Sequence, residues 1–386
     1  MALDGITTSA IVSELKAALL GGRIDKIHQP LADEIRMSIR GLGSGAKKII
    51  ISANSAHPRI HLTESSRENP MTAPLFCMVM RKHIAGGKII DIVQPNFERI
   101  IILRIESANE MGDITTKNLI LEIMGKHSNL ILTDETGKIL DSIKRVTHEK
   151  SSVREVLPGR DYFIPHSGEK KDPLTITETE FKELLHNTPQ NLSKALYMDL
   201  TGLSPVVAAE ICHLASLDGD VSAKEFSDAE LTHLFHAFTW IMDDVREGNF
   251  TPNIIYEGEK PVEFASVPLT MMEGGNYKTV NFSSISELLE RYYAEKNTVS
   301  RIHQKSTDLR KIISNALERS VRKLDLQTRQ LKDTEKREKY RIYGELLNTY
   351  GYGLSGGEKS FKCLNYYDNT EITIPLYPTM TAQENA

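Results

Sequence analysis

Apolar positions in the first 165 residues follow two kinds of spacing, and together they predict a domain that mixes helices and strands. Residues 6–20 have helical spacing and stop at Gly21-Gly22, and residues 71–84 stop in the same way at Gly86-Gly87. Shorter alternating or β-branched runs, separated by Gly, Ser, Asn and Pro, predict strands at residues 23–29, 34–40, 47–53, 58–63, 88–95, 98–106, 117–124 and 128–133. Such a grouping is typical of an α+β domain whose sheets pack face to face.

Residues 174–250 have helical spacing throughout, which predicts a second, helical domain. Its run from Leu192 to Ala215 is interrupted by Thr201-Gly202-Leu203-Ser204-Pro205. Ser204 suits the N-cap and Pro205 the first turn of the helix that follows. This is a helix-hairpin-helix in outline, and such hairpins often present backbone N–H groups to a phosphate. A plain αα-hairpin has the same spacing and is the alternative.

A long helix is predicted after two or three short strands at residues 254–283. It runs from Ser284 to about Tyr350 without Pro and with one Gly. Apolar residues recur near seven-residue spacing, with a stutter between two series: Ile302, Leu309 and Ala316, then Leu317, Leu324 and Leu331. This predicts an imperfect coiled-coil arm, whose apolar seam should favour self-association. Strands near 360–366 and 371–376 predict a small β segment after the arm.

Composition and charge narrow the class of protein. With 40% hydrophobic and 26% charged residues, the chain has the composition of an ordinary soluble protein. The three cysteines form no CxxC pair and predict buried thiols. No signal peptide and no apolar run of about 20 residues is evident, so we expect a cytoplasmic location and no membrane partner. The net charge is −5, yet residues 301–340 contain twelve Lys and Arg against six Asp and Glu, as an RNA-binding arm or a solvated coiled coil would.

Three polar clusters in the first domain are candidate binding sites. They are Arg81-Lys82-His83, Glu98-Arg99 and Lys126-His127-Ser128-Asn129. Arginine suits phosphate recognition or base stacking, although each cluster taken alone also fits a solvated turn or a local ion pair. No Ser-His-Asp order or HExxH spacing is present, so we expect neither an enzyme nor a metal or other cofactor. Gly351 to Gly356 matches the dinucleotide fingerprint in letters, but it follows a helix and precedes a strand, which favours a structural turn.

Five ordered motifs resemble the NFACT family. They are Met1-Ala-Leu-Asp-Gly5, Phe76-Cys-Met-Val-Met-Arg-Lys-His83, Phe97-Glu-Arg-Ile100, Glu122-Ile-Met-Gly-Lys-His-Ser-Asn129 and Leu157-Pro-Gly-Arg-Asp-Tyr162. The resemblance extends over essentially the whole chain. It implies an NFACT-N domain at 1–170, similar to the β-sandwich of formamidopyrimidine-DNA glycosylases, and a helix-hairpin-helix domain at 171–282. A coiled-coil arm at 283–350 and part of a middle domain at 351–386 would follow, with the return helix and the NFACT-R domain beyond them.

The resemblance also implies a function in ribosome-associated quality control. The chain would bind tRNA and a large ribosomal subunit obstructed by peptidyl-tRNA, and would recruit alanyl-tRNA so that the stalled chain acquires an alanine tail. The family needs an Asp-Arg pair for tRNA engagement, and this sequence has Glu98-Arg99 there, which keeps both charges. The predicted tRNA-binding residues are therefore Glu98 and Arg99, joined by Arg81, Lys82, Lys126, His127, Ser128 and Asn129.

Two other functions remain as alternatives. The older family name, fibronectin-binding protein A, implies a surface adhesin with fibronectin as partner, against which the missing signal peptide counts. A nucleic-acid-modifying enzyme is the other. The glycosylases use an N-terminal Pro-Glu, whereas this chain begins Met1-Ala2-Leu3-Asp4 and lacks the cysteines of their zinc finger.

Overall fold

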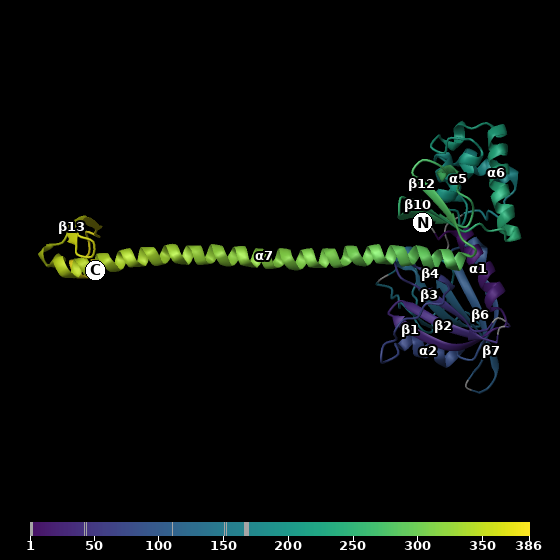
Figure 1. The fold of residues 1–386 in the computed structure, drawn as a ribbon, viewed down its shortest axis with the longest axis horizontal. Coiled ribbons are helices and arrows are strands. Elements are labelled where there is room, and N and C mark those ends of the chain that lie inside the picture. The colour runs from purple at the N-terminus through teal and green to yellow at the C-terminus, as the bar shows by residue number, and fades with distance from the viewer. Residues whose placement is uncertain are drawn as a thin grey trace. The chain divides into compact units, whose positions relative to one another are not determined.

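The chain forms two compact units, Met1–Thr298 and Val299–Ala386 (Figure 1). The computed structural model describes residues 3–41, 43, 45–109, 111–149, 151, 153–165 and 170–386, excluding the side chains of 297–308 and 335. Met1 and Ala2 of the first family motif, and the side chain of Ile302 in the predicted seam, therefore lie outside the described residues.

A nine-stranded antiparallel sheet dominates the first unit, in the order β4-β3-β2-β1-β5-β6-β7-β8-β9. Its strands are β1 (Arg23–Leu31), β2 (Glu34–Arg40), β3 (Lys47–Ser52), β4 (Arg59–Leu62), β5 (Lys88–Val93), β6 (Ile100–Ala108), β7 (Ile114–Glu122), β8 (Asn129–Asp134) and β9 (Ile139–Ser142). The helices α1 (Gly5–Leu19) and α2 (Leu75–Ile84) contribute buried residues to the core of this sheet. The predicted α+β class is confirmed.

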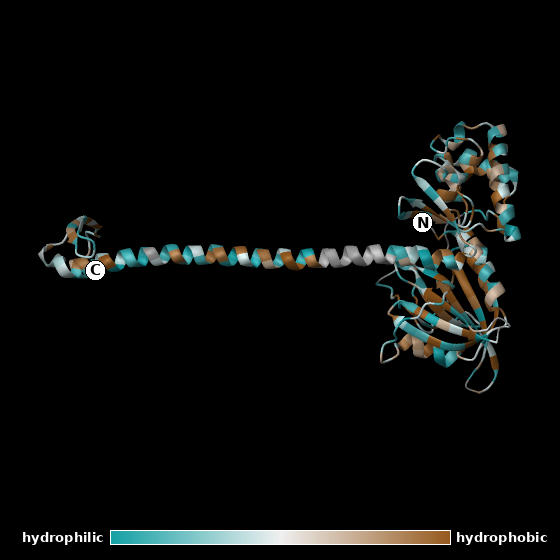
Figure 2. Ribbon diagram, in the orientation of Figure 1, coloured by the Kyte–Doolittle hydropathy of each residue, from teal (hydrophilic) through white to brown (hydrophobic). Residues whose placement is uncertain are grey.

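The sheet has two halves that share one apolar core. β1 pairs with β5 at Arg23 and Lys88, whereas the neighbouring pairs are much longer. Ile35 on β2 and Leu119 on β7 nevertheless belong to the same buried cluster, together with Leu15 of α1 and Met80 of α2. Apolar segments mark these strands in Figure 2. Both halves therefore direct their inner faces at one core, as expected of a sandwich.

A helical part follows within the same unit, with its own apolar cluster. It contains α3 (Glu178–Asn187), α4 (Leu192–Asp199), α5 (Pro205–Leu214) and α6 (Asp228–Glu247). A three-stranded sheet then has the order β11 (Lys260–Ala265), β10 (Asn253–Glu257), β12 (Tyr277–Asn281). Tyr256 and Phe264 of this sheet, and Leu288 at the start of α7 (Ile285–Tyr350), are buried in the core of the large sheet. That core thus extends past the predicted domain boundary at residue 170.

The second unit contains most of α7 and a hairpin of β13 (Ser360–Asn365) and β14 (Thr370–Pro375), followed by α8 (Ala382–Asn385). Leu346 and Leu347 of α7 pack on Ile374 of the hairpin. Leu317, Leu324 and Leu331 are each more than 60% exposed, so this part of the predicted seam has no apolar cover in the described chain. Self-association through the seam stays a prediction.

Two predicted element limits shift for reasons of backbone chemistry. The helix expected at 71–84 begins only at Leu75 because Pro74 is its N-cap, and a proline disfavours helical geometry in the residue before it. The strand expected from residue 98 begins at Ile100. Asn96 and Phe97 adopt left-handed φ angles of 50° and 57°, which place a tight turn before the strand.

Candidate nucleic-acid interface

Two of the three predicted clusters meet at one end of the large sheet. Ile100, the first residue of β6, is paired with Glu122, the last residue of β7. The Ile123 N–H donates to the Arg99 carbonyl at 2.9 Å, which continues this pairing beyond the strands. Glu98-Arg99 and the segment 122–129 are therefore neighbours in space, although the sequence separates them.

The loop of the helical hairpin is fixed against the same end of the sheet. The Gly5 N–H donates to the Gly202 carbonyl at 2.6 Å. A Cβ on Gly202 would lie 2.5 Å from the Phe97 carbonyl oxygen, and Gly202 has a φ of +73°. The Gln94 side-chain amide donates to the Gly5 and Glu98 carbonyls, both at 2.9 Å. This backbone contact holds the hairpin loop against the turn that carries Glu98.

One buried carboxylate joins the N-termini of two helices. Asp4 caps α1 by accepting from the Thr7 N–H at 2.8 Å, and its other oxygen accepts from the Ser204 hydroxyl at 2.6 Å. Ser204 in turn caps α5 by accepting from the Val207 N–H at 3.4 Å. Since Pro205 has no N–H, two of the first three residues of α5 have no amide to offer a phosphate. This favours the plain αα-hairpin over the phosphate-presenting one.

We expect Asp4→Asn to make the free energy of unfolding less dependent on pH. Burial raises the pKa of Asp4, and the hydrogen bonds from Ser204 and Thr7 oppose this only in part. The contribution of Asp4 to stability is thus complete below its ordinary pKa of about 4 and is lost as pH rises through the raised value.

Urea unfolding between about pH 4 and pH 7 should show the unsubstituted chain losing more stability than Asp4→Asn. Asparagine is as good an N-cap as aspartate, so it keeps the cap of α1 while removing the charge. Identical pH dependence in the two proteins would contradict the assignment to Asp4.

A cavity of about 300 Å³ lies at this junction, lined by Glu98, Arg99, Lys170 and the hairpin loop. The Lys170 ammonium donates to the Tyr197 carbonyl at 3.0 Å. Burial lowers the pKa of Lys170, while Glu98 opposes this shift and Arg99 adds to it. The two residues of the predicted pair thus act on a third charged group that comes from the start of the helical part.

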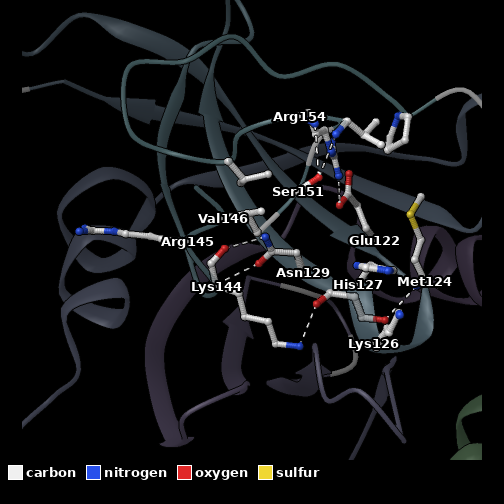
Figure 3. A pocket seen from close by; sticks show the side chains of 14 residues that line it. Glu122, Met124, Lys126, His127, Asn129, Lys144, Arg145, Val146, Ser151 and Arg154 are labelled. Carbon is white, nitrogen blue, oxygen red and sulfur yellow. Dashed lines mark hydrogen bonds and ion pairs between the residues drawn. The ribbon is translucent and has the colours of Figure 1, made fainter. Parts of the chain in front are cut away.

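A larger cavity of about 630 Å³ lies at the same end of the sheet, and we call it the Lys126 cavity (Figure 3). Among the described residues, its lining contains Lys126, Lys144, Arg145, Arg154 and His127, but one acidic residue, Glu122. Lys126 and His127 are exposed on a short turn (Gly125–His127) between β7 and β8. Such an excess of basic side chains around a hollow attracts anions, and a nucleic-acid backbone is one.

The remaining basic residues of the Lys126 cavity hold its wall together. The Lys144 ammonium donates to the Ala53 carbonyl at 2.5 Å and to the Ser128 carbonyl at 2.9 Å. The Arg145 guanidinium makes two bonds to the Asp141 carboxylate, at 3.0 and 3.1 Å. Their charges are therefore fixed in position, and Lys126 and His127 stand at the open side.

A buried ion pair closes the floor of the Lys126 cavity. Arg154 donates to Glu122, whose side chain is fully buried, and to the Phe163 carbonyl at 2.8 Å. The Tyr162 hydroxyl donates to the other Glu122 oxygen at 3.0 Å. Burial, and then the Glu122 charge, raise the pKa of Tyr162 above its ordinary value, so its hydroxyl keeps its proton and remains a donor. Glu122 is therefore the ion-pair partner of Arg154 and the hydrogen-bond acceptor of Tyr162.

The family of the chain is settled by its sequence as a whole. The family model described as NFACT N-terminal and middle domains matches residues 4–386. This chain belongs to the NFACT family.

Known NFACT relatives are similar along the chain in sequence and in structure. The Rqc2 homolog RqcH of Bacillus subtilis is 36% identical over 389 residues, which are 100% of this chain and 65% of that protein. The N-terminal part of the fibronectin/fibrinogen-binding protein of Streptococcus suis has a TM-score of 0.62 and 31% identity, covering 75% of this chain and 98% of that one. A more distant relative, 25% identical over 221 residues, is the human ribosome quality control complex subunit NEMF, which covers 57% of this chain and 19% of that protein. This chain spans about 65% of the length of the bacterial relatives.

Two residues of the predicted NFACT site have buried side chains. The Ser128 hydroxyl accepts from the Met124 N–H at 2.9 Å, and Ser128 is fully buried. The Asn129 side chain accepts from the Lys144 N–H at 3.0 Å and donates to the Lys144 carbonyl at 2.8 Å. Both residues shape the turn that presents Lys126 and His127. Their predicted contact with tRNA stays a prediction.

The third predicted cluster lies away from the other two. The Arg81 guanidinium donates twice to the Ile27 carbonyl of β1, at 2.9 and 2.7 Å. Ser107, near the end of β6, donates to the His83 carbonyl at 2.6 Å, whereas Arg99 precedes the start of that strand. At about 3.3 Å per residue, Ile100 and Ser107 are about 23 Å apart. Arg81 and its exposed neighbour Lys82 therefore lie away from the Glu98-Arg99 end of the sheet, and their predicted contact with tRNA stays a prediction.

No sequence pattern singles out Lys144, Arg145, Arg154 and Lys170. They stand in polar loops without periodic spacing, and only the fold brings them to the two cavities. Tyr162, the last residue of one of the family motifs, was the sequence signal nearest to these residues. Among the described residues no group of three or more His, Cys, Asp or Glu side chains could hold a metal ion. No described helix is long and apolar enough to cross a membrane.

Proposed function

We propose that this chain acts in ribosome-associated quality control. It would bind tRNA and a large ribosomal subunit obstructed by peptidyl-tRNA, and recruit alanyl-tRNA for C-terminal alanine tailing of the stalled chain. The observation that carries the proposal is the 36% identity to an RqcH over the whole chain. The name of the human relative, a ribosome quality control complex subunit, points the same way. The proposal places the chain in the cytoplasm.

The proposed tRNA site is the end of the large sheet where Glu98, Arg99, Lys126 and His127 converge. Both cavities there are lined by basic side chains from several elements. Phosphate contacts fix the position of a nucleic acid, and an arginine can also bind a base edge or stack on a base. Glu98 would assist by holding the charged groups of the junction in place, since it acts directly on Lys170.

The proposed role is positioning and not catalysis. Peptide-bond formation would remain with the ribosome. The chain would contribute by holding the acceptor tRNA so that its reactive end meets the stalled peptidyl-tRNA, which lowers the entropic part of the barrier. We propose that the coiled-coil arm reaches along the ribosomal subunit.

The test is to purify the tagged chain from bacterial cells at moderate salt and to sequence the RNA that co-purifies. We expect tRNA, alanine acceptors above all, and a loss of about tenfold or more in Arg99→Ala, because a hydrogen bond to a charged group contributes about 1.5–3 kcal/mol. Lys126→Ala should lose tRNA as well. Arg104→Ala is the matched control. It also removes one arginine charge, but Arg104 lies within β6 and lines neither cavity of the site.

Absence of RNA even at low salt, where phosphate contacts are strongest, would end the RNA proposal for this chain. Equal losses of tRNA in Arg99→Ala and Arg104→Ala would retain RNA binding but reject the proposed site. Thermal unfolding of all variants would show whether any loss reflects unfolding.

Fibronectin binding is the second candidate, favoured by the name of the structurally similar Streptococcus suis protein. Its test is whether the purified chain captures fibronectin. Capture that survives ribonuclease treatment and is unchanged in Arg99→Ala would show an activity separate from the tRNA site.

A further inference from the structure

A second basic hollow lies on the outer face of the half-sheet formed by β1, β2 and β3. It has a volume of about 390 Å³. Side chains alternate between the two faces of a strand, so Lys26 on β1, Arg36 and Ser38 on β2, and Lys48 on β3 point outwards. The residues between them, such as Ile27, Met37 and Ile49, are buried in the core. The basic residues therefore share one surface, which we call the outer basic face.

The strand register places these residues in rows. Lys26 is paired with Ser38, and Ser38 with Lys48, so two lysines flank a hydroxyl across three strands. At about 4.8 Å between strands, the two lysine Cα atoms are about 10 Å apart. His28 and Arg36 form the neighbouring row. At this spacing, the two long lysine side chains can contact one anionic chain from opposite sides.

The acidic residues that β1 and β2 contribute near this face, Asp25 and Glu34, are paired with arginines. Glu34 is buried and lies 2.9 Å from Arg36, 3.7 Å from Arg67 and 3.9 Å from Arg59, so three guanidinium groups surround one carboxylate. Asp25 lies 2.9 Å from the Arg40 guanidinium. Lys26 and Lys48 are exposed, and no ion pair in the described part of the chain involves either. The face thus has an excess of positive charge.

The other side chains of the hollow are suited to phosphate oxygens. The hydroxyl groups of Ser38, Ser65 and Ser66 and the amide of Asn69 line it and can donate hydrogen bonds, whereas the Thr63 hydroxyl donates to Glu290 at 2.7 Å. Among the described residues that line it, His28 has the one aromatic side chain, so hydrogen-bond donors for phosphate outnumber surfaces for base stacking. The chemistry fits a sugar–phosphate backbone bound without regard to sequence.

The predicted cluster that lay apart from the first site borders this face. Arg81 donates to the Ile27 carbonyl, between Lys26 and His28. Burial lowers the pKa of His28, and the charges of Arg81 and Lys26 lower it further. Arg81 therefore extends the basic surface towards α2.

We propose that the outer basic face binds the phosphodiester backbone of a structured RNA, as a second contact separate from the Glu98-Arg99 end of the sheet. This inference rests on the proposed function, because it takes the chain to be an RNA-binding protein. The two surfaces would hold one RNA at two points or two RNAs at once. Ribosomal RNA and tRNA offer the same backbone chemistry, so the experiment has an arm for each.

The test compares Lys26→Ala/Lys48→Ala with the unsubstituted chain over a series of salt concentrations, using purified tRNA in one arm and purified large ribosomal subunits in the other. Loss of two phosphate contacts should weaken binding about tenfold at low salt and reduce the slope of log K against log salt by about 1.5–2. Lys26→Arg/Lys48→Arg should bind as the unsubstituted chain does. Lys138→Ala/Lys224→Ala is the control, because it removes two exposed lysines outside both surfaces.

A reduced slope in one arm supports the inference and names its RNA source. Unchanged slopes in both arms overturn it. If Arg99→Ala still reduces tRNA binding in that case, the proposed function stands and only the second face is rejected. Lys26→Ala/Lys48→Ala that binds both RNAs normally but no longer retains polyglutamate would assign the face to an acidic protein and also overturn the inference.

Discussion

Arg154→Met is expected to destabilise the first unit by about 3–5 kcal/mol, the largest effect among the substitutions considered. Glu122 is fully buried, and Arg154 is its only ionic partner among the described residues. Methionine fills much of the same space but leaves the carboxylate charged and without a cation. Such a charge inside a protein costs more than the ion pair contributes. Chemical denaturation would measure the loss as a lower urea midpoint.

A second substitution separates this cause from simple loss of packing. Glu122→Gln added to Arg154→Met removes the stranded charge and keeps an acceptor for the Tyr162 hydroxyl, so it should restore a large part of the stability. Arg160→Ala is the surface control. Its partner Glu155 is 2.8 Å away, but the Arg160 side chain is 63% exposed, and the loss should stay within about 1 kcal/mol. A double variant no more stable than Arg154→Met would contradict the electrostatic explanation.

Gly202→Ala is expected to lower the free energy of unfolding by about 2–4 kcal/mol. A left-handed residue with a Cβ costs about 1 kcal/mol, and overpacking adds about 1–3 kcal/mol. The new Cβ would lie 2.5 Å from the Phe97 carbonyl and 3.0 Å from Gly5, which are backbone atoms that cannot rotate away. The hairpin loop would have to move off the large sheet. Thermal or urea unfolding of the purified chain checks the loss.

Gly258 supplies the matched control for that experiment. Its φ is +62°, yet a Cβ placed there meets nothing within 4 Å. Gly258→Ala should therefore cost only the left-handed part, about 1 kcal/mol. Equal losses in the two variants would show that the contact between the hairpin loop and Phe97 does not limit stability.

The sequence predicts most of the secondary structure because those signals are local. The helix expected from Ser284 to Tyr350 is found at Ile285–Tyr350, and the helix expected at 6–20 is found at Gly5–Leu19. Helical spacing and terminal glycines act within a few residues. Where the prediction shifted, as at Pro74, a single residue overrode the periodic pattern.

The assembly of the site was beyond the sequence because it depends on contacts between distant residues. Asp4 and Ser204 are separated by 200 positions in the sequence, and the residues next to each give no sign of this contact. The sequence also does not show which residues of a motif are buried. Lys126 and Asn129 are close in one motif, yet Lys126 is exposed and Asn129 is only 2% exposed. Arg81 also belongs to a family motif, yet it does not lie beside Arg99 and instead contacts Ile27 of β1.

The edge strand β4 has a consequence for the order in which the protein is made. An open strand edge can pair with another chain, and here the Leu62 N–H donates to the Ser286 hydroxyl of α7 at 2.9 Å. That partner is synthesised 224 residues later. At about 5–20 residues per second, the edge emerges about 10–45 s before its cover exists. A growing chain must therefore pass through a stage in which β4 can join a neighbouring chain, and neighbouring ribosomes on one message carry identical edges.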